Sequence, residues 1–377
     1  MTVLQGVAAV RKRPGMYVGD TEDGSGILHL VFEVLANALD LHLSGKCDCI
    51  EIVVDPQGMI SVADNGPGLR LELSEGVSFA ERALTQLHNT PTLDGHAPHE
   101  HLNLGGGLHG VGLCVVCALS SSLQLDVYRD RRHYRQSFAR GQVTSTLLDL
   151  GVATDTGTRI SFLPDPEIFA TSAFSSGLDG SGISKRLQEL AYLLPGLQFK
   201  FLDQRQHVYL ANQGLRAMLE QMRVAHWAHL SPWQYPLLAV KRTLDLIEVE
   251  IVAGWSGSGY GEIRSYANIH ATTGGGTHVN GFLQGLISGL RKSAPALRGL
   301  RATPRNFGIL KTGLYAIVCV RLRDPRFGAP TKDRLSSQDA KRAVRKCAAQ
   351  AFAKYLEAAP ELLAQLSARF ESSEVES

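Results

Sequence analysis

Hydrophobic and polar positions along the chain follow helical periods in some segments and strand periods in others, which predicts a mixed α and β protein. Between residues 27 and 42 nearly every position is apolar, so this segment predicts a helix that is buried on most of its sides. Four polar residues interrupt it at intervals of four and three: His29, Glu33, Asn37 and Asp40. They form one polar stripe along the helix. Either core hydrogen bonds satisfy this stripe or it lines a wet cavity, and its regularity favours the cavity.

The other periodic segments predict the remaining elements. Strands are expected at 50–54, 59–63, 157–162 and 197–202, strand-like alternation at 123–149, and helices at 77–88, 184–193 and 214–224. Tryptophans and prolines change the amino-acid composition of the chain at 225–236, which indicates a domain boundary nearby. Beyond it, strands are expected at 237–243, 247–253, 262–269 and 314–322, and helices at 280–292, 338–356 and 361–370. A Ser/Glu-rich tail at 371–377 predicts disorder.

A glycine-rich stretch precedes an apolar run at 113–119. Residues 105–112 read Gly-Gly-Gly-Leu-His-Gly-Val-Gly, which predicts a flexible loop that leads into a helix N-terminus. Backbone N–H groups and the helix dipole at such a place suit phosphate binding. The stretch also matches G-x-G-x-x-G, but residues 89–101 before it read as a loop rather than a strand, which disfavours a Rossmann site. A glycine turn without a ligand remains the alternative.

A second polar feature lies where the strand at 59–63 meets Asp64-Asn-Gly-Pro-Gly68. This aspartate is either an Asx-turn residue or a fixed acceptor for a ligand held over the turn. Cys114-x-x-Cys117 has metal-site spacing, but it falls in the apolar run and has no second CxxC, so core packing is favoured. His96, His99 and His101 read as a solvated loop rather than a metal site.

Composition narrows the class of protein. The chain has 377 residues, of which 44% are hydrophobic and 20% charged, as in a soluble globular protein with room for two domains. Its net charge of +2 gives no global attraction to nucleic acid or membranes. The sequence has no apolar run of membrane-span length and no signal-peptide core at its start, so we expect a cytoplasmic protein without a membrane partner.

Three stretches resemble, in order and spacing, the nucleotide-binding motifs of the GHKL ATPases: residues 32–38, 64–68 and 106–112. Others resemble one branch of that superfamily, the ATPase region of the B-subunits of DNA gyrase and topoisomerase IV: residues 11–21, 157–158, 275–281 and 331–337. The resemblance extends from about residue 3 to residue 370. It implies an α+β fold, with a GHKL (Bergerat) α/β sandwich at 1–222 and a ribosomal-protein-S5-like transducer domain at 223–370.

The resemblance also implies an ATPase that uses ATP and Mg²⁺. Glu33 would be the general base for the water that attacks the γ-phosphate, and Asn37 would hold Mg²⁺. Asp64 would accept the adenine amino group, with Gly68 and Thr158 beside it. Lys332 from the second domain would neutralise charge that grows on the γ-phosphate. The phosphates would be cradled by the backbone of one run: Gly106, Gly107, Leu108, His109, Gly110, Val111 and Gly112.

Several positions depart from the family pattern. Leu41 stands where a glutamate is usual and Pro67 where an arginine is usual, and these two side chains normally pair beside the adenine. Asn103 occupies the place of a phosphate-contacting lysine, and Pro330 replaces a glutamine. The lid lacks its usual Gly-Gly-Lys, and the N-terminal arm that wraps a partner protomer is short. These departures predict weaker ATP affinity, looser lid closure and no arm-swapped dimer.

The expected function is an ATP-driven clamp, in which two copies associate on binding Mg·ATP and slow hydrolysis reopens them. No TOPRIM or catalytic tyrosine domain follows, so this chain alone is not expected to cleave DNA, whether it is a fragment or a free-standing paralogue. The alternative is a non-catalytic module that binds nucleotide or a gyrase A-type or other topoisomerase partner as a regulator or decoy. DNA contact through basic residues of the transducer is a further hypothesis, although a solvated surface is favoured for each. These are Arg301, Arg305, Lys341, Arg342, Arg345 and Lys346.

Overall fold

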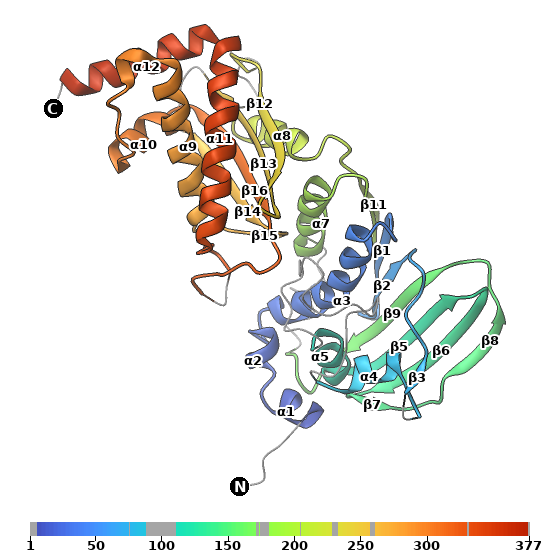
Figure 1. Cartoon of the computed structure of the whole chain (residues 1–377). Coiled ribbons are helices and arrows are strands. Elements are labelled where there is room, and N and C mark those ends of the chain that lie inside the picture. The colour runs from blue at the N-terminus through green and yellow to red at the C-terminus, as the bar shows by residue number, and fades with distance from the viewer. Residues whose placement is uncertain are drawn as a thin grey trace. The chain divides into compact units, whose positions relative to one another are not determined.

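The computed structural model describes residues 6–74, 76–87, 111–170, 173, 181–203, 205–227, 233–256, 261–329 and 332–375. The chain forms two compact units, Met1–Asn212 and Gln213–Ser377, and each is described by itself (Figure 1). The boundary therefore falls before the position at 222/223 that the sequence suggests. Helix α8 (Leu215–Trp227) is the reason, because it packs against strands β13 (Ile247–Trp255) and β16 (Leu314–Arg321) of the second unit.

The first unit is a mixed sheet with helices packed on it (Figure 1). The strands of the sheet are β1 (Cys49–Val54), β2 (Ile60–Asp64), β5 (Ser120–Arg129), β6 (Arg132–Ala139), β7 (Gln142–Val143), β8 (Leu148–Val152), β9 (Gly157–Pro164), β10 (Gln198–Leu202) and β11 (Gln206–Tyr209). Their order is β11-β10-β1-β2-β9-β5-β6-β7, with β8 paired to β6. β1 and β10 run parallel, and the other pairs in this sheet are antiparallel. Strands β3 (Leu73–Ser74) and β4 (Val77–Ser78) form a separate short hairpin.

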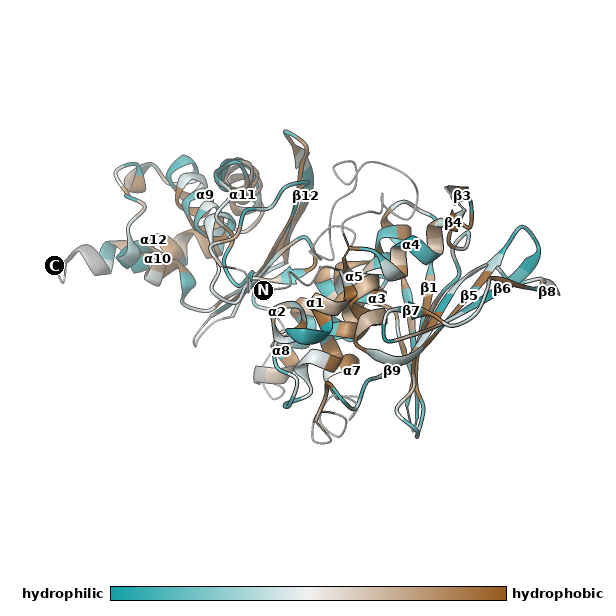
Figure 2. Ribbon diagram, turned by 90° about the horizontal axis from the view of Figure 1, so that it is seen from below, coloured by the Kyte–Doolittle hydropathy of each residue, from teal (hydrophilic) through white to brown (hydrophobic). Residues whose placement is uncertain are grey.

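Helices of the first unit pack on this sheet, and one of them, α3 (Ser25–Leu43), carries the predicted polar stripe. The helices of the unit are α1 (Val7–Lys12), α2 (Gly15–Val18), α3, α4 (Phe79–Thr85), α5 (Gly112–Ala118) and α7 (Ser181–Leu193). Hydrophobic residues dominate α3 and α5 (Figure 2). By length and composition alone α3 could cross a membrane, but most of its apolar side chains are buried in the unit, as in the core helix of a folded domain. Its polar stripe is half-buried at Glu33, Asn37 and Asp40 and exposed at His29.

The second unit is a five-stranded sheet in the order β12-β13-β16-β14-β15, in which β14 and β16 run parallel. Its further strands are β12 (Leu238–Leu244), β14 (Glu262–Ala267) and β15 (His270–Ala271). Its further helices are α9 (Thr277–Ser293), the 3₁₀ turn Pro295–Leu297, α10 (Pro304–Lys311), α11 (Gln338–Ala358) and α12 (Pro360–Val375). Trp255 stacks on Phe352 and Tyr355 of α11, so this helix seals the apolar face of the sheet.

Three predictions need correction. The sequence pattern does not reveal α10, which begins at a Thr303 cap that accepts from the Asn306 N–H and has proline in its first turn. The tail expected to be disordered from 371 continues α12 as far as Val375. The basic segment around Arg11, where the sequence analysis expects no helix, forms helices α1 and α2, and the Arg11 side chain is only 20% exposed.

Candidate functional site

The polar stripe of α3 presents a carboxylate and an amide one turn apart. The Glu33 side chain is 15% exposed, and its Oε1 lies 3.1 Å from His29 Nε2. The Asn37 Nδ2 donates to the Glu33 carbonyl oxygen at 3.0 Å, which fixes the amide against its own helix. This hydrogen bond uses the NH₂ end of the amide and leaves Oδ1 as its acceptor end. The structure therefore presents one carboxylate and one amide oxygen on the same side of α3.

The start of α5 lies against this carboxylate. A Cβ at Gly112 would lie 2.1 Å from Glu33 Oε2, so any side chain there would displace the carboxylate from its position. Val111, just before the helix, is buried. The segment Gly106–Gly110, which contains Gly107, Leu108 and His109, lies outside the described residues, as do His96, His99, His101 and Asn103. Of the glycine-rich stretch, the structure thus places its last two residues, and these two adjoin Glu33.

Asp64 ends β2 as a half-buried acceptor. Its Oδ1 accepts from the Gly66 N–H at 2.8 Å, as in an Asx turn. Strand β9 lies beside β2 and brings Thr158 to the same place, where Thr158 Oγ1 accepts from the Leu69 N–H at 3.0 Å. Burial raises the pKa of Asp64 to about 6, although hydrogen bonds from the Gly66 and Thr158 backbones oppose the shift. The side chain thus titrates close to neutral pH.

Gly68 is required by the shape of this turn. Its φ is 78°, and a Cβ there would lie 2.6 Å from the Tyr128 carbonyl oxygen. Arg129 Nη1 donates to the Gly68 carbonyl oxygen at 3.0 Å and holds the turn against β5. Gly68 and Thr158 therefore lie beside Asp64, as the sequence resemblance implies.

The two departures beside the predicted adenine position lie together. A Cβ at Gly66 would be 3.0 Å from Leu41 Cδ1, so this leucine, at the end of α3, packs under the turn that contains Pro67. Leu41 is buried and Pro67 is exposed. The contact is apolar where the family pattern has an ion pair, and this is consistent with the loss of both partners at once.

Lys332 belongs to the second unit. It lies in the loop before α11 with a φ of 57°, and its N–H donates to the Ala329 carbonyl oxygen at 3.1 Å. The next residues are tied to the start of α9: the Gly274 N–H donates to Asp333 O at 2.8 Å, and the Thr277 N–H donates to Leu335 O at 2.9 Å. The loop that bears Lys332 is therefore anchored to a helix N-terminus. Pro330 lies outside the described residues.

The two cysteines of the apolar run, Cys114 and Cys117, pack in the hydrophobic core. Cys114 and Cys117 are fully buried in α5, and burial raises the pKa of each thiol to about 12. This burial matches the core-packing interpretation of the sequence. Within the part of the chain that the structure describes, no group of three or more His, Cys, Asp or Glu residues is arranged to hold a metal ion.

Two family models match the chain in tandem. Residues 22–168 match the histidine kinase-, DNA gyrase B- and HSP90-like ATPase family, and residues 214–375 match the DNA gyrase B family. The B-subunit of DNA gyrase from Caulobacter vibrioides is 32% identical over 382 residues, which cover 95% of this chain and 46% of that protein. The B-subunit of DNA gyrase from Thermotoga maritima is 32% identical over 388 residues, 98% of this chain and 58% of that protein. The chain spans about half the length of these relatives.

Solved structures match both units at once. The 43K ATPase domain of Thermus thermophilus gyrase B, determined in complex with an aminocoumarin, has a TM-score of 0.79 and 32% sequence identity. That match covers 98% of this chain and 95% of the other. The B-subunit of DNA gyrase from Myxococcus xanthus has a TM-score of 0.77 at 28% identity and covers 95% of this chain. The chain therefore belongs to the DNA gyrase B family of GHKL ATPases, with a nucleotide-binding sandwich followed by a transducer domain.

Proposed function

We propose that this chain binds Mg²⁺·ATP between α3, β2 and the start of α5, and that it hydrolyses the nucleotide slowly. The contact between the Glu33 carboxylate and Gly112, at the end of the glycine-rich stretch, is the observation that supports this most directly. This contact places the Glu33 carboxylate, the proposed base, beside backbone N–H groups that can bind phosphate. Asp64 supports it independently, because a half-buried acceptor at a strand end is suited to an adenine amino group.

Each first-unit residue has a role that follows from its position. Glu33 would accept the proton of the attacking water, and His29, whose Nε2 lies 3.1 Å from Glu33 Oε1, helps to fix the carboxylate. Asp64 would accept from the adenine amino group. The rigid turn at Gly68 and the Thr158 hydroxyl would hold Asp64 at the correct angle. Amides of Gly106–Gly112 would bind the phosphates, and Lys332 would stabilise charge on the γ-phosphate.

Asn37 is the residue that we propose to hold the magnesium ion. Mg²⁺ prefers oxygen ligands, and the amide at Asn37 offers Oδ1 because its Nδ2 is bonded to the Glu33 carbonyl. One protein oxygen is an ordinary complement for Mg²⁺, which keeps several waters and takes other ligands from substrate phosphates. When bound, the ion would neutralise phosphate charge and orient the γ-phosphate.

The wider assembly is also part of the proposal. Nucleotide binding would promote association of two copies, and hydrolysis would separate them in a clamp cycle in the cytoplasm. A gyrase A-type or other topoisomerase partner would supply DNA cleavage. DNA would contact the transducer unit through its basic residues, of which Arg301, Arg305, Arg342, Arg345 and Lys346 are exposed and Lys341 is half-buried. Light scattering with a non-hydrolysable ATP analogue tests the association: a mass that stays monomeric argues against the clamp.

The test of hydrolysis is Glu33→Gln. Loss of a general base lowers rates by about 10²–10⁴-fold, so we expect kcat to fall by that order while the analogue still binds. Glu72→Gln, which removes an exposed carboxylate of the same unit, is the matched control and should leave kcat unchanged. Phosphate release measured at saturating ATP decides the question, and a Glu33→Gln protein that hydrolyses ATP like wild type removes Glu33 from the mechanism.

A non-catalytic regulator or decoy is the second candidate. The observation in its favour is the apolar contact of Leu41 under the turn of Pro67, where the family pattern has a charged pair. If wild type binds the analogue with no measurable phosphate release, the regulator replaces the ATPase.

A further inference from the structure

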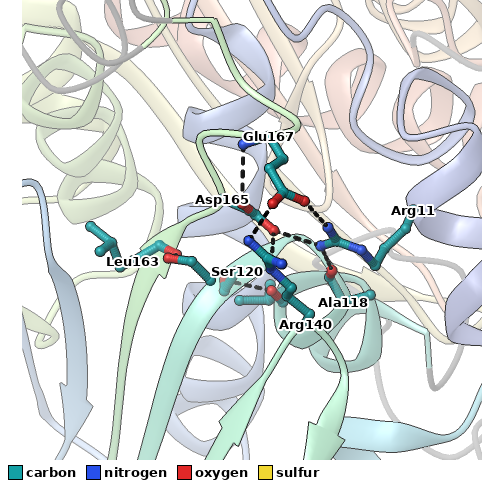
Figure 3. A network of polar contacts seen from close by, with 9 residues as sticks. Arg11, Ala118, Ser120, Arg140, Leu163, Asp165 and Glu167 are labelled. Atoms are coloured by element: carbon teal, nitrogen blue, oxygen red, sulfur yellow. Dashed lines mark hydrogen bonds and ion pairs between the residues drawn. The ribbon is translucent and has the colours of Figure 1, made fainter.

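Arg11 of α1 reaches the last residue of α5 (Figure 3). Its Nη1 donates to the Ala118 carbonyl oxygen at 2.8 Å and also lies 2.8 Å from Asp165 Oδ2. Arg140, just after β6, places its Nε 3.0 Å from the same carboxylate oxygen. Glu167 contacts both guanidinium groups, at 3.4 Å from Arg11 and 2.7 Å from Arg140. Two cations thus share two carboxylates, but only Arg11 also contacts Ala118.

Asp165 connects this cluster of ion pairs to the interior of the unit. Its side chain is fully buried, whereas Glu167 and Arg140 are 60% and 45% exposed. Burial opposes ionisation of Asp165, yet the Glu167 N–H and the Arg11 guanidinium keep its pKa below the ordinary value. A buried carboxylate needs such partners. Asp165 therefore binds both arginines, and the Arg11 guanidinium also meets the Ala118 carbonyl at the end of α5.

The C-terminal end of α5 depends on groups from elsewhere in the chain. The helix has no basic residue in its last turn. Ser120 Oγ donates to the Val116 carbonyl oxygen at 2.6 Å, and Arg11 donates to the Ala118 carbonyl oxygen. A cation at a helix C-terminus complements the helix dipole and satisfies an otherwise unpaired carbonyl. Arg11 supplies this cation from α1.

The other end of α5 is the end that adjoins Glu33. With seven residues the helix is about 10 Å long, and its internal hydrogen bonds make it move as one body. It packs on both α1 and α3. A displacement of Ala118 along the helix axis is therefore transmitted to Gly112, where a Cβ would lie 2.1 Å from Glu33 Oε2.

We propose that Arg11 is a positioning residue for the ATPase site. By holding the Ala118 carbonyl it fixes α5 along its axis, and so it fixes the placement of Glu33 against Gly112. This inference rests on the proposed function of Glu33. It differs from a general stabilising role, because it assigns the effect to the α5 contact rather than to the ion pairs with Asp165.

Arg140 supplies the matched control. Arg11→Met and Arg140→Met each remove one cation from Asp165 and one contact to Glu167, but only Arg11→Met releases Ala118. Displacements of about 1 Å at a catalytic group cost up to about 100-fold, so we expect kcat of Arg11→Met to fall by about tenfold or more. KM for ATP should change less than about threefold, because Asp64 is untouched, and Arg140→Met should keep kcat within about twofold. Both are assayed well below their melting temperatures.

Amide hydrogen exchange of residues 112–118 gives a second readout that needs no turnover. Arg11→Met should speed exchange in this segment, and Arg140→Met should not. Equal losses of kcat in both variants, unchanged kcat in Arg11→Met, or unchanged exchange in Arg11→Met would each overturn the inference. If wild type itself shows no ATPase activity, the proposed function fails, and the exchange measurement still decides whether Arg11 fixes α5.

Discussion

At the scale of single residues, Asp64 has the property with the clearest experimental signature. Its pKa is about 6 in the folded protein, above the ordinary aspartate value, because burial disfavours the charged carboxylate. A raised pKa means that the folded state holds the proton more tightly than the unfolded state. The associated loss of stability is absent below about pH 4, grows between about pH 4 and 6, and is complete above that range.

Nucleotide binding should follow the same titration. An adenine amino group donates, so it prefers the ionised carboxylate, and affinity should weaken as the pH falls through about 6, by up to about tenfold per unit. Isothermal titration with a non-hydrolysable analogue between pH 5 and 8 measures this. Asp64→Asn has no titrating group at this position, so its profile should be shallower than that of wild type and should keep only the titration of the analogue's own phosphates, whose second pKa is about 6. A wild-type affinity that stays constant across pH 6 would contradict the role of Asp64 in adenine binding.

Residue types and their spacing are enough to reveal part of the site. The interval between Glu33 and Asn37 predicts a shared stripe, and the structure places both on one half-buried side of α3. The role of Arg11 could not be read in this way, because its partner Ala118 lies 107 positions along the chain. A basic triplet looks the same whether it is solvated or tied to a distant carbonyl. The catalytic and binding roles themselves remain predictions.

At the scale of elements, periodicity locates most helices and strands because their buried faces are long and regular. Periodicity does not locate α10, because this helix is short and has Leu310 as its one fully buried side chain. Helix α8 is recognisable from its pattern, but an amphipathic pattern does not say which sheet the apolar face meets. Its contacts with β13 and β16 place it in the second unit rather than the first.

The pair α9 and α11 depends on glycines at the contact. A Cβ at Gly285 would lie 2.6 Å from Ala348 Cβ and 2.8 Å from the Arg345 carbonyl oxygen, so the two helices approach more closely than side chains allow. We expect Gly285→Ala to lower the free energy of unfolding by about 1–3 kcal/mol through overpacking. Chemical denaturation measures the change.

Gly308→Ala, in the middle of α10, is the control for that substitution. Nothing lies within 4 Å of a Cβ at this position, and alanine in a helix should raise stability by about 0.5–1 kcal/mol. Equal effects of the two substitutions would mean that helix propensity, rather than close packing of α9 on α11, sets the cost.

At the scale of the whole molecule, the chain consists of two units that each have their own sheet and core. Such units predict two transitions in calorimetry. A non-hydrolysable analogue at about 100 times its Kd should stabilise the nucleotide-binding unit by about 2.7 kcal/mol and raise its transition. The transducer transition should rise less, because Lys332 is the transducer residue proposed to contact the nucleotide. A single transition, or an equal shift of both, would contradict this division of stability.

The order of the two units is readable from the sequence, because motifs for each occur in separate halves. The position of the junction is less accessible. The change of composition at 225–236 begins in the last turn of α8, and the division at Asn212/Gln213 has no such mark. Sequence pattern therefore identifies what the halves are, and three-dimensional packing is needed to say where one ends.

The apolar contact between Leu41 and Gly66 has a consequence for small molecules that compete with nucleotide. If adenine binds beside Asp64 as proposed, a compound that extends past the Gly66–Gly68 turn meets the buried Leu41 side chain, where the family pattern that the sequence resembles has a glutamate. Scaffolds that rely on a charged partner at the position of Leu41 would lose affinity for this chain. Scaffolds with a compact lipophilic substituent at that end would gain affinity. The turn would therefore make inhibitors of this chain differ from those that suit its relatives.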